Sequence, residues 1–428
     1  MLEIQKIRQD AQPFIDGLKN RNIKDAAEKI EQLLTLDQNR RDSITELEQL
    51  RNTMNQSSKS IGKLMKEGKK EEAEAVKSEL ASSKERIKDL EQEVQTIESS
   101  TYDLLTTLPN IPHPSVPLGK DASDNAVISQ NDIQVTFNFT PKPHWDLALE
   151  HDIIDWKLGV KLTGSGFPVY KGKGAILQRA LINFFLTKAR EAGYTEIMPP
   201  LMINEASGFG TGQLPDKEGQ MYEVQLDGFY LIPTAEVPIT NLYREDILNQ
   251  EDLPIKNCGY TPCFRREAGS YGKDVKGLNR LHQFDKVELV QVTLPEHSYD
   301  TLEKMTSYVE SLLTALELPF RRLLLCTGDA TFTSAKTYDL EVWSAGQEMW
   351  LEVSSVSNFE TFQANRLKLR YRDENNKTQL LHTLNGSALA LPRIVAALLE
   401  NNQQADGSIL IPEVLRPYTG FDRIGETI

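Results

Sequence analysis

The sequence predicts an α+β protein in which a helical N-terminal arm precedes a larger domain of strands and helices. Three observations support this division. Residues 1–105 carry no strand pattern, and two long stretches within them space apolar residues alternately three and four apart. Four prolines follow within residues 106–120, which therefore form a stiff linker. From residue 121 to residue 428 strand-like runs alternate with helical runs.

Composition excludes several classes of protein. The 428 residues suffice for two or three domains, and the net charge of −14 argues against a basic nucleic-acid coat. Three cysteines are too few for a disulfide framework. The charged N-terminus resembles no signal peptide, and no apolar run approaches the ~18 residues that span a membrane. We therefore expect a cytoplasmic location, without membrane or DNA as a partner.

The arm is predicted to be an antiparallel coiled coil. Residues 24–66 and 70–104 keep the three-four spacing over more than ~4 heptads, and residues 66–69 interrupt it. Each helix would extend roughly 50–60 Å. Pro13 and Gly17 are expected to break the first helical turns.

Positive charge gathers near the turn between these two helices. Between residues 51 and 70 six basic residues oppose the single acidic residue Glu67, a local net charge of +5 in an acidic chain. A solvated helix face is one interpretation. The local excess favours binding to a phosphate backbone. The residues concerned are Arg51, Lys59, Lys63, Lys66, Lys69 and Lys70.

The first part of the larger domain reads as a series of short elements. We predict strands at 125–129, 133–138, 166–170 and 194–198, and helices at 144–156 and 175–192. Residues 208–219 read as a glycine-rich loop. Asp227-Gly228 predicts a hairpin between strands 221–224 and 229–232. Thr234 is a good N-cap for the helix that follows.

Residues 258–291 form the stretch around which the chain is organised. Runs 259–265 and 282–291 suit two antiparallel strands, and the loop between them holds Gly269, Gly272, Gly277, Lys273, Lys276 and Arg280. Arg265 could bind a phosphate with two hydrogen bonds, and Phe284 could offer its face to a base. A surface hairpin with a charged tip is the alternative.

The C-terminal part supplies further candidates. We predict a helix at 296–316, strands at 320–325, 340–343 and 350–355, and a final strand at 409–418. Glu352 and Ser355 could hold Mg²⁺ together with nucleotide phosphates, although a half-buried strand would also account for them. Residues 382–387 lead into a helix that begins near Leu389 or Leu391, tolerates Pro392 in its first turn and carries Arg393.

These motifs resemble those of the class II aminoacyl-tRNA synthetases. F-R-R-E at 264–267 followed by H-Q-F-D-K-V-E at 282–288 resembles motif 2, and the whole string is similar to that of bacterial-type seryl-tRNA synthetases. The T-A-E triplet at 234–236 and the L-R-P-Y ending at 415–418 are similar to the same family. The helix, strand and proline of 175–200 resemble motif 1, and Arg393 is the matching arginine of motif 3, where Pro392 replaces a frequent glycine.

The resemblance implies an antiparallel sheet flanked by helices and a homodimer formed through residues 175–200, although that segment alone would equally suit one core. It implies activation of L-serine with ATP and Mg²⁺, then transfer of the seryl group to tRNA(Ser). Whether tRNA(Sec) is also a substrate stays open. The arm would bind the tRNA.

The resemblance also assigns roles to individual residues. Arg265 would hold the α-phosphate and the serine carboxylate, and Phe284 and Arg393 would enclose adenine. Catalytic roles fall to Arg265 and Arg393, and metal binding to Glu352 and Ser355. The implied ATP-binding set is Arg265, Arg266, Glu267, Phe284, Glu352, Val353, Ser354, Ser355 and Arg393. The implied serine-binding set is Thr234, Ala235, Glu236, Arg265, Glu288, Asn385 and Ser387.

Three other functions are weighed against this one. A synthetase-like binding module is disfavoured by the intact Arg265, Glu267, Glu352 and Arg393. A prolyl or threonyl enzyme is a second possibility, but the zinc-binding cysteine and histidine set of threonyl enzymes is not found. A purely structural coiled coil leaves the larger domain unexplained.

Overall fold

The computed structural model describes residues 1–267 and 276–425, which form two compact units, Met1–Pro109 and Asn110–Ile428. Gly269, Gly272 and Lys273 of the predicted cationic loop lie outside the described residues.

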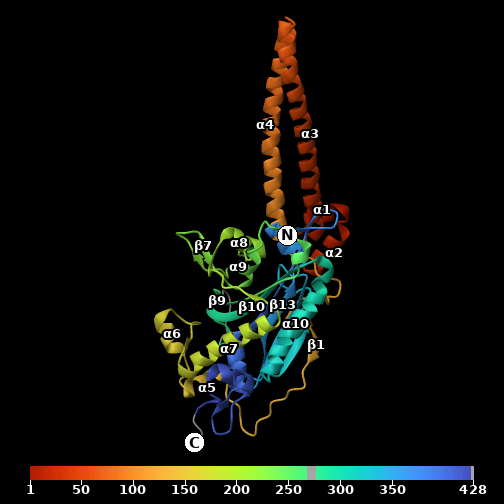
Figure 1. Cartoon of the computed structure of the whole chain (residues 1–428). Coiled ribbons are helices and arrows are strands. Elements are labelled where there is room, and N and C mark those ends of the chain that lie inside the picture. The colour runs from red at the N-terminus through yellow and green to blue at the C-terminus, as the bar shows by residue number, and fades with distance from the viewer. Residues whose placement is uncertain (268–275, 426–428) are drawn as a thin grey trace. The chain divides into compact units, whose positions relative to one another are not determined.

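The first unit is helical. It contains α1 (Ile4–Gln9), α2 (Gln12–Asn20), α3 (Ala26–Lys66) and α4 (Lys70–Thr107). The long helices α3 and α4 run side by side in opposite directions and are joined at Gly68, whose φ of 79° suits glycine (Figure 1). The predicted antiparallel coiled coil is confirmed. The predicted break near Pro13 is present, because α1 ends at Gln9 and α2 begins at Gln12 with the proline in its first turn, where no intrahelical N–H bond is lost. Gly17 does not break the chain, since it lies within α2.

The seam between α3 and α4 changes along its length. Ile30, Leu33, Leu90 and Ile97 are buried near the base, whereas no residue from 48 to 72 is buried. The polar seam residue Asp37 is buried, and its carboxylate accepts hydrogen bonds from Arg8 at 3.0 Å and Arg41 at 3.1 Å. These partners explain how an acid is tolerated within an apolar stripe.

The second unit is built on an eight-stranded sheet. In spatial order its strands are β1 (Ala126–Gln130), β11 (Phe320–Leu324), β12 (Lys336–Ser344), β13 (Met349–Asn358), β16 (His382–Ala390), β10 (Gln283–Thr293), β9 (Ile255–Phe264) and β4 (Thr195–Glu196). Neighbours pair antiparallel, except that β4 runs parallel to β9. The predicted antiparallel-dominated sheet is therefore confirmed.

Three helices cover this sheet. They are α7 (Gly172–Glu191), α10 (Ser298–Ala315) and α12 (Leu391–Asn401), and they pack with the sheet into one large apolar core (Figure 1). Leu177, Leu181, Phe184 and Phe185 of α7 are buried there because their spacing places them on one helical face. The predicted helix start at Leu391 is correct.

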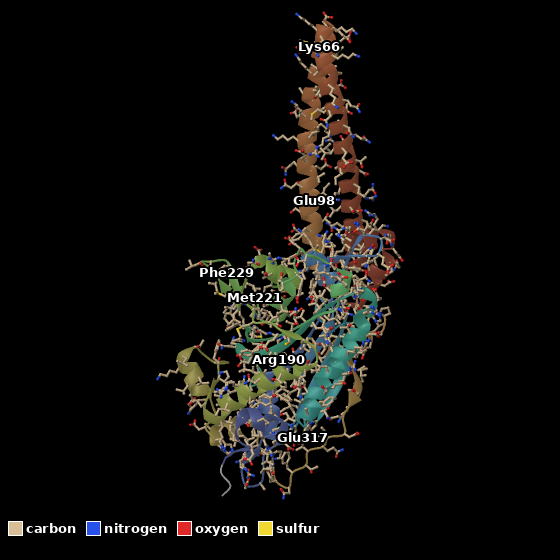
Figure 2. All side chains as sticks on the ribbon, viewed as in Figure 1. Lys66, Glu98, Arg190, Met221, Phe229 and Glu317 are labelled. Carbon is tan, nitrogen blue, oxygen red and sulfur yellow. The ribbon has the colours of Figure 1, made fainter. Side chains whose placement is uncertain are left out.

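Shorter elements complete the unit. The helices are α5 (His144–Glu150), α6 (Trp156–Leu162), α8 (Glu205–Thr211), α9 (Glu236–Asn241), α11 (Thr361–Leu367) and α13 (Arg416–Thr419). The strands are β2 (Ile154–Asp155), β3 (Val169–Tyr170), β5 (Met202–Asn204), β6 (Glu223–Val224), β7 (Phe229–Leu231), β8 (Ile247–Leu248), β14 (Arg370–Arg372), β15 (Thr378–Leu380), β17 (Ile409–Leu410) and β18 (Arg423–Ile424). The predicted hairpin of β6 and β7 is confirmed, and the exposed Phe229 lies on it (Figure 2).

Four predicted elements differ from the structure. Residues 133–138 alternate in exposure but belong to no strand, and residues 144–156 divide into α5, β2 and the start of α6. The glycine-rich loop predicted at 208–219 begins later than expected, because α8 continues to Thr211. Its glycines serve close packing, since a Cβ on Gly208 would lie 2.7 Å from Leu214 and one on Gly210 would lie 2.5 Å from Leu367. The strand predicted at 409–418 ends at Leu410, because Pro412 cannot donate to a ladder.

The cysteines and the helices can be compared with the expectations of no disulfide framework and no membrane span. Cys258, Cys263 and Cys326 are free and buried. Among the helices of residues 1–267 and 276–425, none is both long and apolar enough to cross a bilayer.

Candidate active site

Side chains from four elements of the second unit form one cluster of buried polar groups, the candidate pocket. Thr234, just before α9, accepts hydrogen bonds from the Lys286 ammonium at 2.8 Å and from the Glu236 amide at 3.2 Å. The Thr234 hydroxyl donates to Glu288 Oε2 at 3.1 Å. The predicted N-cap is displaced by one position, because α9 is capped by Ala235, which is itself buried. Thr234 instead links α9 to strand β10.

Glu288 is the acid at the centre of this pocket. Its side chain is completely buried, and Asn385 Nδ2 on β16 donates to its Oε1 at 3.3 Å. Ser387 pairs with Glu288 across the β10–β16 ladder, and its carbonyl accepts from the Ser354 hydroxyl at 2.6 Å. Hence Asn385 and Ser387 lie at one place on the sheet with Glu288, which is 97 residues from Asn385 in the sequence.

A second buried acid, Glu236, lies in the same pocket. Gln363 of α11 donates to its Oε1 at 2.7 Å and is itself held by Thr383, whose hydroxyl donates at 2.7 Å. Burial raises the pKa of Glu236 to about 7, and the negative charge of Glu288 adds to the increase. The hydrogen bond from Gln363 and the positive charges of Lys286 and Arg265 act in the opposite direction.

The predicted phosphate-binding arginine lies beside the predicted base-stacking ring. Arg265 follows β9, and its guanidinium carbon lies 5.3 Å from the centre of the Phe284 ring on β10. Its Nε donates to the Pro233 carbonyl at 3.2 Å, which ties it to the segment that carries Thr234. This bond uses Nε, and the two terminal nitrogens of the guanidinium have the geometry to bind a phosphate or carboxylate with two hydrogen bonds.

Arg266 is held by a backbone hydrogen bond and Glu267 by an ion pair. The Arg266 amide donates to the Gln220 carbonyl at 2.9 Å. Glu267 has a φ of 50°, and its carboxylate forms an ion pair with Arg280 at 3.1 Å. Positive φ is unusual for glutamate, so the chain turns sharply where β9 ends.

Arg393 of α12 joins three segments. Its Nε donates to the Asn279 carbonyl at 3.1 Å, and NH1 donates to the Glu352 carbonyl at 2.6 Å. NH1 also lies 3.8 Å from the Glu352 carboxylate. The motif 3 arginine and the predicted metal ligand therefore meet directly. Of the remaining predicted ATP-binding residues, Val353 and Ser354 are buried on β13.

The surroundings of Glu352 and Ser355 fit a magnesium ion. Both side chains offer oxygen, the donor that Mg²⁺ prefers, and 49% of the Glu352 side chain is exposed to a ligand. Asp339 faces Ser355 across the β12–β13 ladder, and its solvent-inaccessible Oδ1 has no hydrogen-bond partner among residues 1–267 and 276–425. Within the described residues no group of three acidic, histidine or cysteine side chains forms a closed metal cage.

The predicted tRNA-binding residues all lie on the arm. Lys66 marks the end where α3 turns into α4, away from Glu98 (Figure 2). Arg51 pairs with Glu91 at 2.6 Å, and Lys69 lies 3.6 Å from Glu67. Lys59, Lys63, Lys66, Lys69 and Lys70 are all exposed.

Sequence reasoning missed Lys286, Gln363 and Asp339. A signal for Lys286 was present, because residues 284, 286 and 288 of one strand point to the same face. Gln363 had no such signal, since it reaches Glu236 across 127 residues of chain.

Comparison with known proteins is consistent with this geometry. Residues 222–402 match the class II core domain of tRNA synthetases (G, H, P, S and T), and residues 1–112 match the seryl-tRNA synthetase N-terminal domain. The serine--tRNA ligase of Salinibacter ruber is 56% identical over 426 residues, 99% of each chain. That of Carboxydothermus hydrogenoformans is 48% identical over 426 residues, also 99% of each chain. Seryl-tRNA synthetase from Pyrococcus horikoshii, solved with ATP, aligns with a TM-score of 0.93 and 37% identity over 99% of each chain.

The fold and the matched core domain thus define a class II aminoacyl-tRNA synthetase. Both parts of the chain match a single branch of that class over nearly their whole length. The chain belongs to the seryl-tRNA synthetase family.

Proposed function

We propose that this chain activates L-serine with ATP and transfers the seryl group to tRNA(Ser). The observation that carries the proposal is the buried pocket of Thr234, Glu236 and Glu288 next to Arg265 and Phe284. It combines acids that suit an ammonium and a hydroxyl with an arginine that suits phosphate and carboxylate groups.

The first step joins serine to the α-phosphate of ATP. A serine carboxylate oxygen forms the new bond to phosphorus, and the bond from that phosphorus to the departing pyrophosphate breaks. Arg265 is the group that holds both reactants and stabilises the charge that develops on the α-phosphate oxygens. Positioning by Arg265 and the pocket replaces a covalent intermediate on the protein, so no side chain acts as nucleophile.

The second step transfers the seryl group. A hydroxyl of the terminal tRNA ribose attacks the acyl carbon, and the bond to AMP breaks. The exposed lysines of the arm contact tRNA phosphates. Their positive charge attracts the tRNA backbone whatever its sequence. We extend the same chemistry to tRNA(Sec) as a further substrate, and we expect it to occur in the cytoplasm.

Serine is selected by paired polar groups. Glu236 receives the ammonium group, while Glu288 and Ser387 meet the remaining polar groups of serine, with Asn385 and Ala235 lining the pocket. A pocket built to bond a hydroxyl rejects an analogue that lacks it by on the order of 10⁴-fold, because its buried partners stay unpaired. Threonine adds a methyl group and is refused by the tight pocket.

Nucleotide binding uses the residues around Phe284 and Arg393. Phe284 stacks on one face of adenine, Arg393 covers the other face, and Glu267 accepts from the base edge. Arg266 adds positive charge, and Val353 and Ser354 form the strand beneath. When bound, Mg²⁺ neutralises phosphate charge; Glu352 and Ser355 would hold it.

We further propose that two copies associate through residues 175–200. The side chains of this region line a hollow of about 570 Å³ that includes Ile182, Leu186 and Met198. Met198 is 90% exposed, and the buried hydroxyl of Tyr170, which lines the same hollow, has no hydrogen-bond partner within the described part of the chain. An exposed apolar surface of this kind favours a second copy as its cover.

Amino-acid-dependent exchange of pyrophosphate into ATP tests the function. Serine should support exchange, whereas alanine, threonine and proline should not. Exchange with another amino acid in place of serine would assign the chain a different substrate, and none at all would identify a binding module. Charging of tRNA(Ser) and tRNA(Sec) measured with the same protein then tests the second step.

A further inference from the structure

Lys286 is a buried cation in the proposed serine pocket to which the activation chemistry assigns no part. Its side chain is only 7% exposed, and its ammonium lies 2.5 Å from Glu288 Oε2 and 2.8 Å from the Thr234 hydroxyl. It comes from β10, two residues from both Phe284 and Glu288, so all three side chains share one face of the strand. A charged lysine is seldom buried unless it has partners of this kind.

The hydrogen-bond directions around Lys286 follow from its chemistry. An ammonium can only donate, so the Thr234 oxygen must accept from it. The Glu236 amide also donates to that oxygen, at 3.2 Å. The proton of Thr234 is therefore directed to Glu288 Oε2, which lies 3.1 Å away. Lys286 thus determines both the place of the Glu288 carboxylate and the polarity of the Thr234 hydroxyl.

The two acids of the pocket, Glu236 and Glu288, need another positive charge beside them in addition to that of Arg265. Glu236 and Glu288 are two buried acids within interaction range of one another. Acids that share a dry site cannot both ionise without compensation. The positive groups that act on Glu236 are Lys286 and Arg265. The proposed first step assigns Arg265 to the α-phosphate and the serine carboxylate. Lys286 is left to compensate Glu288.

We propose that Lys286 is a positioning residue that prepares the pocket for a zwitterionic amino acid with a short hydroxyl side chain. Together with Thr234, it holds the Glu288 carboxylate in one orientation before the substrate enters. The remaining lone pairs of Glu288 are then available to the substrate without reorganisation. This inference rests on the proposed activation of serine.

The experiment separates serine binding from ATP binding. Lys286→Met keeps the length of the stem but removes charge and donor, and Lys286→Gln keeps a donor without the charge. Serine affinity is measured by calorimetry without ATP, and ATP affinity without serine. We expect Lys286→Met to weaken serine at least ~100-fold and ATP less than ~3-fold, because breaking a buried charge pair leaves the acid uncompensated. Lys286→Gln should recover about tenfold of that loss through its hydrogen bonds.

A matched control comes from the same sheet. Lys336 on β12 has an 11% exposed side chain that lies 3.9 Å from Glu303, so Lys336→Met removes a comparable buried cation elsewhere. This control should leave serine affinity unchanged. Thermal midpoints identify the folded variants, and Lys286→Gln decides the question if Lys286→Met does not fold.

Two results would overturn the proposal. One is a folded Lys286 variant with serine affinity within ~3-fold of the parent protein. The other is an equal loss of serine and ATP affinity, which would make Lys286 a general structural residue. Failure of the parent protein to bind or activate serine would instead reject the proposed function, independently of Lys286.

Discussion

Arg265 is the residue on which the proposed first step depends most directly. Its guanidinium is held by Pro233 and lies over Phe284, so its terminal nitrogens are fixed before ATP arrives. Arg265→Ala should lower the rate of seryl-adenylate formation by on the order of 10²–10³, the usual effect of removing one preorganised donor. Serine-dependent pyrophosphate exchange measures this rate. Arg372→Ala, at an exposed arginine on β14, is the control; a rate for Arg265→Ala close to that of the control would reject the role.

Glu236 predicts a particular dependence of stability on pH. Burial raises the pKa of its carboxyl from 4.5 to about 7, so between these values the folded state binds a proton that the unfolded state has released. The folded state therefore loses relative stability as pH rises from 4.5 to 7. At pH 8 the cost is on the order of 3 kcal/mol, and it disappears near pH 4.

Glu236→Gln removes this titration while its amide oxygen can still accept from Gln363. We expect the variant to unfold at a higher temperature than the parent protein at pH 8 and at a similar temperature at pH 5, measured by calorimetry. Glu251→Gln, at an exposed residue, should show no such trend. A constant difference across this pH range would mean that Glu236 does not titrate there. Serine affinity should also fall below pH 7 in the parent protein, because the protonated acid cannot pair with an ammonium.

Individual site residues differ in how well sequence could anticipate them. Glu288 lies on β10 and Arg265 directly follows β9, its antiparallel neighbour, so a recognisable motif places both in one site. Glu236 was recognisable only through the T-A-E triplet at 234–236. No pattern in the neighbouring sequence indicated that Gln363 would be its buried partner. Side chains brought together by tertiary packing leave no periodic trace in the sequence.

At the scale of elements, the arm makes the sharpest prediction. Lys59, Lys63 and Lys66 are exposed near the end of the helical pair. Replacing all three by glutamine should weaken tRNA binding and reduce the log–log salt slope by up to ~0.7–0.9 per lost phosphate contact. Filter binding at several salt concentrations measures both quantities.

The matched control lies on the other long helix. Lys77→Gln, Lys84→Gln and Lys88→Gln together remove the same charge from α4, where acidic neighbours surround each lysine. An identical salt slope for both triple variants would show that the first three lysines are an ordinary solvated surface.

The long helices of the arm were predictable from sequence, because their apolar repeat extends over many turns. Helix α8 was not predictable, since its glycines are typical of a loop and only the close packing of the folded protein explains their presence in a helix.

The whole molecule should be a homodimer. Met198 and the apolar side chains of α7 surround a hollow that a second copy would cover. Sedimentation equilibrium at micromolar concentration should give twice the chain mass of 48.4 kDa. Met198→Glu should shift the equilibrium to the monomer, and Met202→Glu, at another exposed methionine, serves as control. A monomeric parent protein would refute the prediction.

Removal of the first unit tests whether amino-acid activation and tRNA binding belong to different units. Every described residue of the proposed pocket belongs to the unit Asn110–Ile428. Removing residues 1–109 should leave serine-dependent pyrophosphate exchange nearly intact and abolish charging of tRNA. Normal charging by the shortened protein would mean that tRNA is selected by the other unit.

The uneven seam of the arm implies a gradient of local opening. Tight apolar packing surrounds Ile30, Leu33, Leu90 and Ile97, whereas residues 48–72 bury no side chain completely. Segments with few buried contacts open at low free energy, so amide protons near the turn should exchange with solvent much faster than those at the base. The phosphate-binding end would then enter a complex as a loosely ordered pair of helices and become ordered on the nucleic acid. Part of the binding free energy would be spent on that ordering, which makes release of the charged product faster than the number of contacts alone would suggest.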